Sequence, residues 1–258
     1  MNICYLIQGS ARLLKNFPFP HSNDIFIASY DEPLSIDGAK TIYVPNTSWA
    51  EGRNTLLDTA LKKNKYDYFV FCDDDVSFLS GSFFSFEQAL RVYKPLVGVP
   101  RTPASEMFVP TIPDTSVQRA NIFDQQFIAL HKKLIGKVGI APLVTEYDNV
   151  SWHITCEIFN YLLTHEFHKF IHQYNDIMIS NNVHRVGSEE SDYRTTDKIT
   201  TQKCVKAYLE DKGIHYRVGL IKSFILHKNP KNCYKSFYNN IFKKRKLISL
   251  AKDWKPYF

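Results

Sequence analysis

The sequence predicts an α/β fold: an open, mixed and mainly parallel sheet flanked by helices, followed by a basic helical tail. Two observations predict it. Short apolar runs alternate with helical patterns through the first hundred residues, which is the spacing of strand–helix–strand units. Three consecutive aspartates, Asp73-Asp74-Asp75, follow the fourth apolar run. Ligands of open parallel sheets bind just beyond the carboxyl ends of the strands, so these aspartates mark a candidate site.

The first half of the chain is expected to contain five strands and two helices. Ser48 or Thr47 can cap the first helix, in which Glu51 near the start and Lys62-Lys63 at the end both suit the helix dipole. The second helix is expected around residues 86–93. The apolar runs expected to form strands are residues 3–7, 24–29, 41–44, 66–72 and 96–99.

The second half has a less regular pattern. Residues 101–120 carry three prolines and are expected to form a loop. Residues 151–163 and 200–212 have helical spacing, and Gly213 is placed to end the later helix. We also expect a strand or short helix over 124–134, strands over 138–145, 177–179 and 216–218, and a polar loop over 187–194.

Composition and charge favour a globular protein that does not bind nucleic acid. Of the 258 residues, 44% are hydrophobic and 14% aromatic, which is typical of a chain with a buried core. Residues 228–258 carry nine Lys/Arg and one acid, a balance of +8, so the net charge of +6 leaves −2 for residues 1–227. The basic character belongs to the tail, and no nucleic-acid partner is expected.

Cysteine usage and hydropathy predict a cytoplasmic protein, with peripheral membrane contact through the tail as an alternative. The five cysteines are scattered and form no C-x-x-C pair, which indicates neither a zinc cluster nor a disulfide framework. No apolar run approaches the roughly 20 residues that a membrane-spanning helix needs. The first residues also lack the pattern of a secretory signal.

The three aspartates predict a site for a divalent cation. Adjacent carboxylates repel one another, and their burial is unfavourable unless a cation compensates. Side chains alternate along an extended chain, so Asp73 and Asp75 can share one face and offer hard oxygen ligands to one Mn²⁺ or Mg²⁺. Such a cation keeps open positions for the phosphates of a substrate. The alternative is a solvated acidic turn.

The segment Phe69-Val70-Phe71-Cys72-Asp73-Asp74-Asp75-Val76 resembles the D-x-D segment of GT-A (Rossmann-like) glycosyltransferases. The tetrapeptide Asp-Asp-Asp-Val is similar to the version in β-1,3-galactosyltransferase-like and Fringe-like enzymes. The resemblance implies that Asp75 ligates the metal, that Asp73 contacts the ribose or shares the metal, and that Asp74 lines the donor-sugar side. The Glu-Asp-Val motif and the membrane anchor of those Golgi families are not visible, so no family is assigned.

The resemblance extends to four residues of the first half. Asp31, after the second strand, matches the acidic residue that contacts the nucleotide base, or else is a turn residue. Arg53 matches a basic residue near the nucleotide, or else is a surface charge of its helix. Gln8 and Gly9 end the first strand and are expected to border the nucleotide.

The second half should supply the acceptor site and, in an inverting enzyme, a base. Asp148 stands just ahead of a helix, where GT-A enzymes commonly place a carboxylate that takes the acceptor proton. Its alternative role is an N-cap. Glu157, Glu190 and Asp192 are rival bases. Trp152 is either a platform for an acceptor sugar or a core residue.

The expected function is a metal-dependent glycosyltransferase (hexosyl- or pentosyltransferase) that uses Mn²⁺ or Mg²⁺. It would move a sugar from a nucleotide-sugar donor, with a UDP-sugar favoured, to a glycan or lipid-linked acceptor. Many GT-A enzymes add a histidine to the metal ligands. The candidate for that histidine here is His227, and the alternative is His184. One alternative is a metal-dependent nucleotidyltransferase or phosphotransferase, although no G-x-x-x-x-G-K loop is present. Another is a non-catalytic sugar- or nucleic-acid-binding module.

These expectations divide the chain into a GT-A catalytic domain, residues 1–227, and a basic extension, residues 228–258. The domain has a nucleotide-sugar-binding half, residues 1–100, and an acceptor-binding half, residues 101–227. A helix over residues 234–251 would carry apolar and aromatic side chains largely along one side. That pattern predicts either contact with an anionic membrane surface or docking of the helix on the domain.

Overall fold

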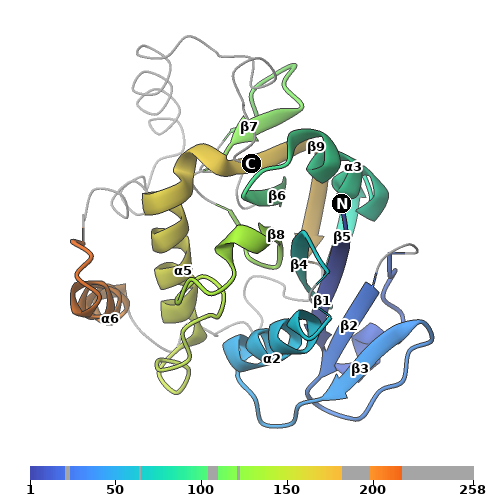
Figure 1. The fold of residues 1–258 in the computed structure, drawn as a ribbon, viewed down its shortest axis with the longest axis horizontal. Coiled ribbons are helices and arrows are strands. Elements are labelled where there is room, and N and C mark those ends of the chain that lie inside the picture. Colours follow the sequence, from blue (N-terminus) through green and yellow to red (C-terminus); the bar gives the residue numbers. More distant parts are fainter. Residues whose placement is uncertain (21–23, 64, 104–109, 121–122, 182–197, 217–258) are drawn as a thin grey trace.

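The computed structural model describes residues 1–20, 24–63, 65–103, 110–120, 123–181 and 198–216, which build one mixed sheet with helices on both faces (Figure 1). The strands are β1 (Ile3–Gly9), β2 (Asp24–Ser29), β3 (Ala39–Tyr43), β4 (Tyr68–Asp73), β5 (Val76–Ser80), β6 (Val97–Arg101), β7 (Val117–Arg119), β8 (Phe127–His131) and β9 (Ile171–Asn181). The α-helices are α1 (Ala11–Leu14), α2 (Trp49–Leu61), α3 (Phe83–Tyr93), α5 (Trp152–Phe167) and α6 (Lys198–Asp211), and the 3₁₀ turns are η1 (Lys132–Leu134) and η2 (His168–Phe170).

The strand order places β4, which ends at Asp73, in the interior of the sheet. The order is β3-β2-β1-β4-β8-β6-β9-β5, and β7 pairs with β9. Strands β1 to β4 are parallel to one another, whereas β8 is antiparallel to both β4 and β6. Because β9 is parallel to β6 and antiparallel to β5 and β7, six of the nine described strands point the same way. The predicted mixed, mainly parallel sheet is confirmed.

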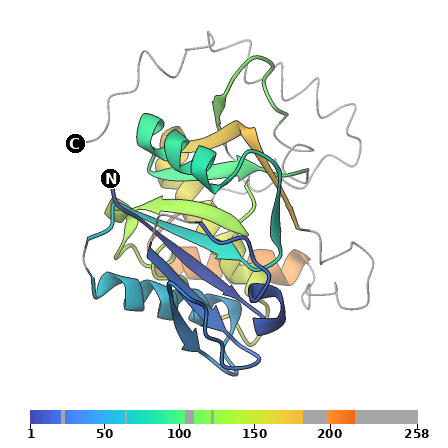
Figure 2. The ribbon, with the colours of Figure 1, turned by 90° about the vertical axis from the view of Figure 1, so that its right-hand side faces the viewer.

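Two apolar layers hold the helices to the sheet. One buried cluster joins β1, β4 and β8 to α2, α5 and α6 through side chains such as Leu6, Phe71 and Ile128. The other joins the opposite face of these strands to α1 and α3 through residues such as Tyr5 and Phe127. Figure 2 shows α3 on one side of the central strands and α2 and α6 on the other. The sheet is therefore buried on both faces, which explains the unbroken apolar runs of its central strands.

Most expected elements are confirmed within a few residues. The five strands of the first half and the helices α2, α3, α5 and α6 are present. Ser48 is the N-cap of α2, and Glu51 completes a capping box with it. Residues 124–134 contain both expected alternatives, the strand β8 and the turn η1. Gly213 follows α6 with a φ of 70°, a conformation that favours glycine.

Other expectations differ from the structure. Residues 138–145 form a turn and an irregular segment in which Ala141 makes an isolated bridge to Lys137, because Gly139 (φ 86°) and Pro142 interrupt the run while Ile140 and Leu143 fill the core. The expected loop over 101–120 contains β7, and α1 and β5 were not expected. Tyr216 belongs to no strand. Residues 217–218, the loop over 187–194, His184, Glu190, Asp192, His227 and the extension 228–258 lie outside the described residues.

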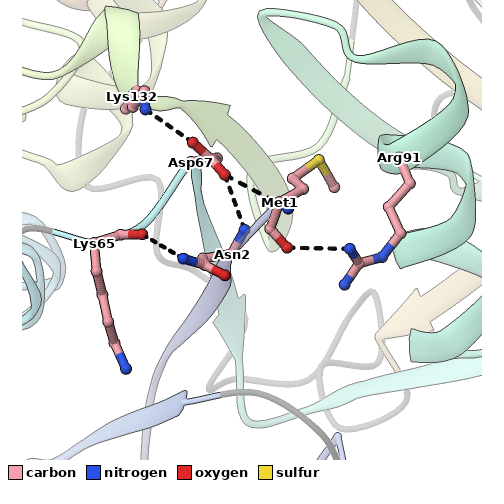
Figure 3. Close-up of polar contacts among 6 residues, drawn as sticks. All are labelled: Met1, Asn2, Lys65, Asp67, Arg91 and Lys132. Atoms are coloured by element: carbon pink, nitrogen blue, oxygen red, sulfur yellow. Dashed lines mark hydrogen bonds and ion pairs between the residues drawn. The ribbon is translucent and has the colours of Figure 1, made fainter.

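The amino ends of the strands are tied together by polar contacts (Figure 3). Asp67, which precedes β4, accepts hydrogen bonds from Asn2 N at 2.9 Å and Lys132 Nζ at 2.8 Å. Asn2 Nδ2 donates to the carbonyl of Lys65 at 2.9 Å. From α3, Arg91 donates to the Met1 carbonyl at 3.1 Å. These contacts fix β1 against β4 at the edge opposite to the aspartates.

None of the helices in the described part of the chain is both long and apolar enough to span a bilayer.

Replacement of Phe127 by Ala should lower the free energy of unfolding by about 3–5 kcal/mol. Phe127 is fully buried, and its ring centroid lies 4.8 Å from that of Phe86 and 5.8 Å from that of Phe83. The matched control is Phe84→Ala, whose side chain is 69% exposed and should change stability by no more than about 0.5 kcal/mol. Urea unfolding of both variants measures the difference, and equal losses would contradict this packing.

Candidate functional site

Asp73 and its two neighbours in the sheet form a polar row at the carboxyl edge. Asp73 is in register with Gln8 of β1, and its backbone N donates to the carbonyl of Gln126, just before β8, at 2.9 Å. One step back along the strands, the same face carries the apolar row of Leu6, Phe71 and Ile128. The site therefore begins where the core on the α2 and α5 side ends.

Asp73 is held by a buried arginine of α2. Arg53 Nη2 donates to Asp73 Oδ1 at 2.7 Å and to the carbonyl of Gln125 at 2.9 Å. The Arg53 side chain is only 3% exposed, whereas that of Asp73 is 24% exposed. The Arg53 guanidinium also lies 4.1 Å from the ring centroid of Trp49. Arg53 is thus not a surface residue of its helix, and its positive charge offsets the negative charge of Asp73.

Asp74 points the other way, as the alternation of side chains requires. Its Oδ2 accepts a hydrogen bond from Ser10 N at 2.7 Å. Burial raises the pKa of Asp74 to about 7, the charges of Asp75 and Asp73 add to this rise, and the bonds from Ser10 oppose it. The structure places this carboxylate against the end of β1. Gly9 lies beneath it, where an added Cβ would fall 2.0 Å from Asp74 Cγ.

Asp75 is 8% exposed and directly precedes β5. No group of three potential His, Cys, Asp or Glu ligands for a metal ion occurs among the residues that the structure describes. Asp73 and Asp75 nevertheless provide hard oxygen atoms, and Mg²⁺ is commonly held by one or two carboxylates together with substrate phosphates. Arg53 engages Oδ1 of Asp73, and no described residue donates to Oδ2. These two aspartates fit an open cation site of that kind.

Three glutamines around Asp73 carry buried amide oxygens that have no hydrogen-bond partner in the described part of the chain: Gln8, Gln125 and Gln126. Arg53 Nε is buried without a partner in the same sense. Gln8 packs against α2 so closely that a Cβ on Gly52 would lie 2.7 Å from its Oε1. An unsatisfied buried polar atom costs about 1–3 kcal/mol, so each one calls for an explanation, such as a bound water, an ion or a ligand. Sequence reasoning identified Gln8 but missed the two glutamines before β8.

Asp124 is a further carboxylate at this edge that was not predicted from the sequence. Its side chain is exposed, and its Oδ1 accepts from Gln126 N at 3.0 Å. Desolvation by the surrounding protein raises its pKa, and the charge of Asp73 adds to the rise, although Arg53 and two backbone N–H groups oppose it. The signal in the sequence was a short polar run, Asp124-Gln125-Gln126, ahead of a buried strand.

Asp31 lies at the end of β2 and supports α1. Its Oδ1 accepts from Ala11 N at 2.7 Å and from Glu32 N at 2.9 Å. Desolvation raises its pKa, but these backbone bonds outweigh it and the pKa is lowered. The Asp31 side chain is exposed and adjoins the end of β1, where Tyr30 N donates to the carbonyl of Gly9 at 3.4 Å.

Asp148 lies at the junction between α5 and α2. It accepts hydrogen bonds from the hydroxyls of Ser48, the N-cap of α2, and of Thr155 in α5. Burial raises the pKa of Asp148, whereas both hydroxyls lower it and the charge of Glu51 raises it. The N-cap of α5 is Ser151 and not Asp148. The capping alternative is therefore wrong for this helix.

Two tryptophans line the same junction. The ring centroids of Trp152, at the start of α5, and Trp49, at the start of α2, are 6.1 Å apart. Trp152 is 37% exposed, so it is not a core residue. Of the rival bases, the described one is Glu157, which lies within the helix and pairs with His153 at 3.6 Å. The helix starts thus combine a carboxylate of raised pKa with an accessible aromatic ring.

No protein-family model and no curated protein sequence matches this chain. Glucosyl-3-phosphoglycerate synthase from Mycobacterium tuberculosis, solved with Mn²⁺, UDP and glucosyl-3-phosphoglycerate, is similar to it at a TM-score of 0.49 and 11% identity, covering 83% of this chain and 81% of that one. S. aureus TarS 1-349, solved with UDP-GlcNAc, is similar at 0.45 and 12%, covering 93% and 81%. A197 from STIV is similar at 0.41 and 13%, covering 71% and 87%. Because similarity at this level shows at most a shared fold, the function of this chain is argued from its own residues.

Replacement of Gly9 by Ala should lower the free energy of unfolding by about 1–3 kcal/mol, the usual range for overpacking. The added Cβ would collide with the Cβ and the carboxylate of Asp74, which the backbone of β4 holds in place. The comparison is Gly52→Ala, whose Cβ would come close only to the end of the Gln8 side chain and would lie at an ordinary 4.0 Å from Thr47 Oγ1, and which gains helix propensity. Thermal unfolding of both variants provides the measurement. A Gly52→Ala variant that loses as much stability as Gly9→Ala would contradict this account.

Proposed function

We propose that this protein is a metal-dependent GT-A glycosyltransferase that moves a sugar from a nucleotide-sugar donor to a glycan or lipid-linked acceptor. The observation that carries the proposal is the end of β4. There a D-x-D segment extends an interior strand, and a buried arginine holds its first carboxylate. A parallel α/β sheet binds its ligand at this edge.

The donor would lie across the carboxyl ends of β1, β2 and β4. Asp73 and Asp75 would hold Mn²⁺ or Mg²⁺, with His227 as a candidate third ligand. When bound, the cation would neutralise the charge that develops on a diphosphate leaving group. Gln8, Gly9 and Asp31 surround the same edge from β1 and β2. A UDP-sugar is the favoured donor, on the resemblance of the D-x-D segment.

The acceptor would approach over the starts of α2 and α5. In an inverting reaction, Asp148 would take the proton of the acceptor hydroxyl as its oxygen attacks the anomeric carbon. Its raised pKa makes it a stronger base than an ordinary aspartate, and the Ser48 and Thr155 hydroxyls orient it. The exposed ring of Trp152 offers the apolar face of a sugar a stacking surface.

Removal of the metal or of its ligand should abolish transfer. EDTA and the Asp75→Asn variant are each expected to lower the rate by about 10²-fold or more, because metal stabilisation of the leaving group is worth several kcal/mol. Added Mn²⁺ should reverse the EDTA effect. The control is Asp58→Asn, an exposed aspartate on α2. The measurement is donor hydrolysis and transfer across a panel of nucleotide sugars. Full activity of the native chain in EDTA would contradict metal dependence.

Replacement of Asp148 by Asn should lower kcat by about 10²-fold or more and leave donor binding unchanged. A base works only when ionised, and burial raises the pKa of Asp148. The rate of the native enzyme should therefore fall as the pH drops through a value above the ordinary aspartate pKa, and the variant should lack this limb. The pH dependence of kcat/KM tests this. The Glu157→Gln variant should keep the limb, and its loss there would assign the base to Glu157 instead.

A further inference from the structure

Arg53 is too deeply buried to be a simple nucleotide contact. We infer that it acts instead as a positioning residue, which fixes Asp73 for the cation and couples the D-x-D segment to helix α5 through Gln125. The inference rests on the proposed function, because it assigns Asp73 a cation to hold. It differs from the sequence-based expectation, in which Arg53 touches the donor.

The guanidinium of Arg53 is fixed on three sides. Its Nη2 donates to Asp73 Oδ1 at 2.7 Å and to the Gln125 carbonyl at 2.9 Å. Trp49 lies 4.1 Å and Phe71 5.5 Å from it, measured to the ring centroids. With 3% of the side chain exposed, little of Arg53 is accessible to a ligand. What a ligand can reach is the partly exposed carboxylate of Asp73, to which Arg53 donates.

Stability alone does not call for an arginine at this position. A buried ion pair can often be replaced by apolar residues of similar volume without loss of stability, because desolvation of the charges offsets their attraction. Arg53 also leaves its Nε buried without a partner in the described structure, which is unfavourable. The arrangement is better explained by what it does to Asp73.

Fixing Asp73 matters because this residue ends a strand and is followed by two more carboxylates. Repulsion from Asp74 and Asp75 would otherwise turn its carboxylate outward and increase its rotamer freedom. Arg53 engages Oδ1 and leaves Oδ2 without a donor among the described residues, in a side chain that is 24% exposed. Residues that hydrogen-bond to a metal-ligating side chain and orient it typically contribute about 10–100-fold to metal affinity or activity.

Gln125 extends the same contact to the acceptor side. Its backbone carbonyl accepts from Arg53, while its side-chain Nε2 donates to the Cys156 carbonyl at 2.8 Å and to Asn160 Oδ1 at 3.1 Å, both in α5. One residue therefore binds the arginine behind the D-x-D segment and the helix that follows Asp148. Loss of Arg53 would free Asp73 and remove one anchor of the turn before β8.

The test compares Arg53→Met and Arg53→Lys with the native chain. Methionine is unbranched and apolar, whereas lysine keeps the charge but lacks the planar fork. The control is Arg91→Met, an exposed arginine of α3 that donates to the Met1 carbonyl. Binding of Mn²⁺ in the presence of UDP is followed by electron paramagnetic resonance, and thermal unfolding checks the fold. Neither readout depends on turnover.

Arg53→Met should fold and should bind Mn²⁺ with UDP about 10–100-fold more weakly than the native chain. Arg53→Lys should be intermediate, and Arg91→Met should bind normally. A further variant, Arg53→Ala, leaves space beside Asp73 and Trp49, and free guanidinium at low concentration, but not ammonium, should restore part of its affinity for Mn²⁺.

Native affinity in a folded Arg53→Met variant would overturn the inference. If that variant does not fold, native affinity in folded Arg53→Lys overturns it, and weakened affinity supports it. Failure of the native chain to bind Mn²⁺ and UDP at all would overturn the proposed function, and the inference with it. The two failures are distinguishable, because only the second affects the native protein.

Discussion

Three adjacent carboxylates at the end of a buried strand impose the constraint on which this site depends. Two unit charges about 4 Å apart interact by about 4 kcal/mol near a protein surface, so the aspartates must be separated and compensated. Asp73 turns to Arg53 of α2, and Asp74 turns to the backbone N–H of Ser10. Asp75 is buried ahead of β5. The position of Asp74 in turn requires glycine at position 9, because only a residue without a Cβ leaves room for the Asp74 side chain.

The same constraint joins the two halves of the chain. Arg53 reaches from α2 to the carbonyl of Gln125, whose side chain holds α5, and the start of α5 meets that of α2 through Trp152 and Trp49. In the sheet, β8 from the second half lies between β4 and β6 from the first. A donor bound at the end of β4 and an acceptor bound at the start of α5 would therefore share one frame of contacts. Transfer between them requires this, since a displacement of about 1 Å can cost roughly 10²-fold in rate.

The elements that the sequence predicted correctly are those that depend on short stretches of the chain. The central strands were predictable because burial on both faces makes them unbroken apolar runs, and α2 because Ser48 and Glu51 form a capping box. The strand expected over 138–145 was wrong because its apolar residues serve a turn packed on the core. Asp73 and Asp75 could be identified from the strand before them. The polar run Asp124-Gln125-Gln126 is visible in the sequence, but its place beside Asp73 depends on β8 inserting antiparallel beside β4, and no local pattern specifies that pairing.

The surroundings of the two ends of β4 differ in how completely their polar groups are satisfied, and this difference is consistent with a site at the carboxyl end. At the amino edge, Asp67 accepts hydrogen bonds from Asn2 N and Lys132 Nζ, and these contacts hold the ends of β1 and β4 together. At the carboxyl edge, the amide oxygens of Gln8, Gln125 and Gln126 are buried with no partner among the described residues. Stability alone would favour satisfying both edges, because each orphaned oxygen is unfavourable by about 1–3 kcal/mol. The orphaned oxygens at the carboxyl end of β4, next to three aspartates and a buried arginine, therefore support the proposed binding of a polar ligand there.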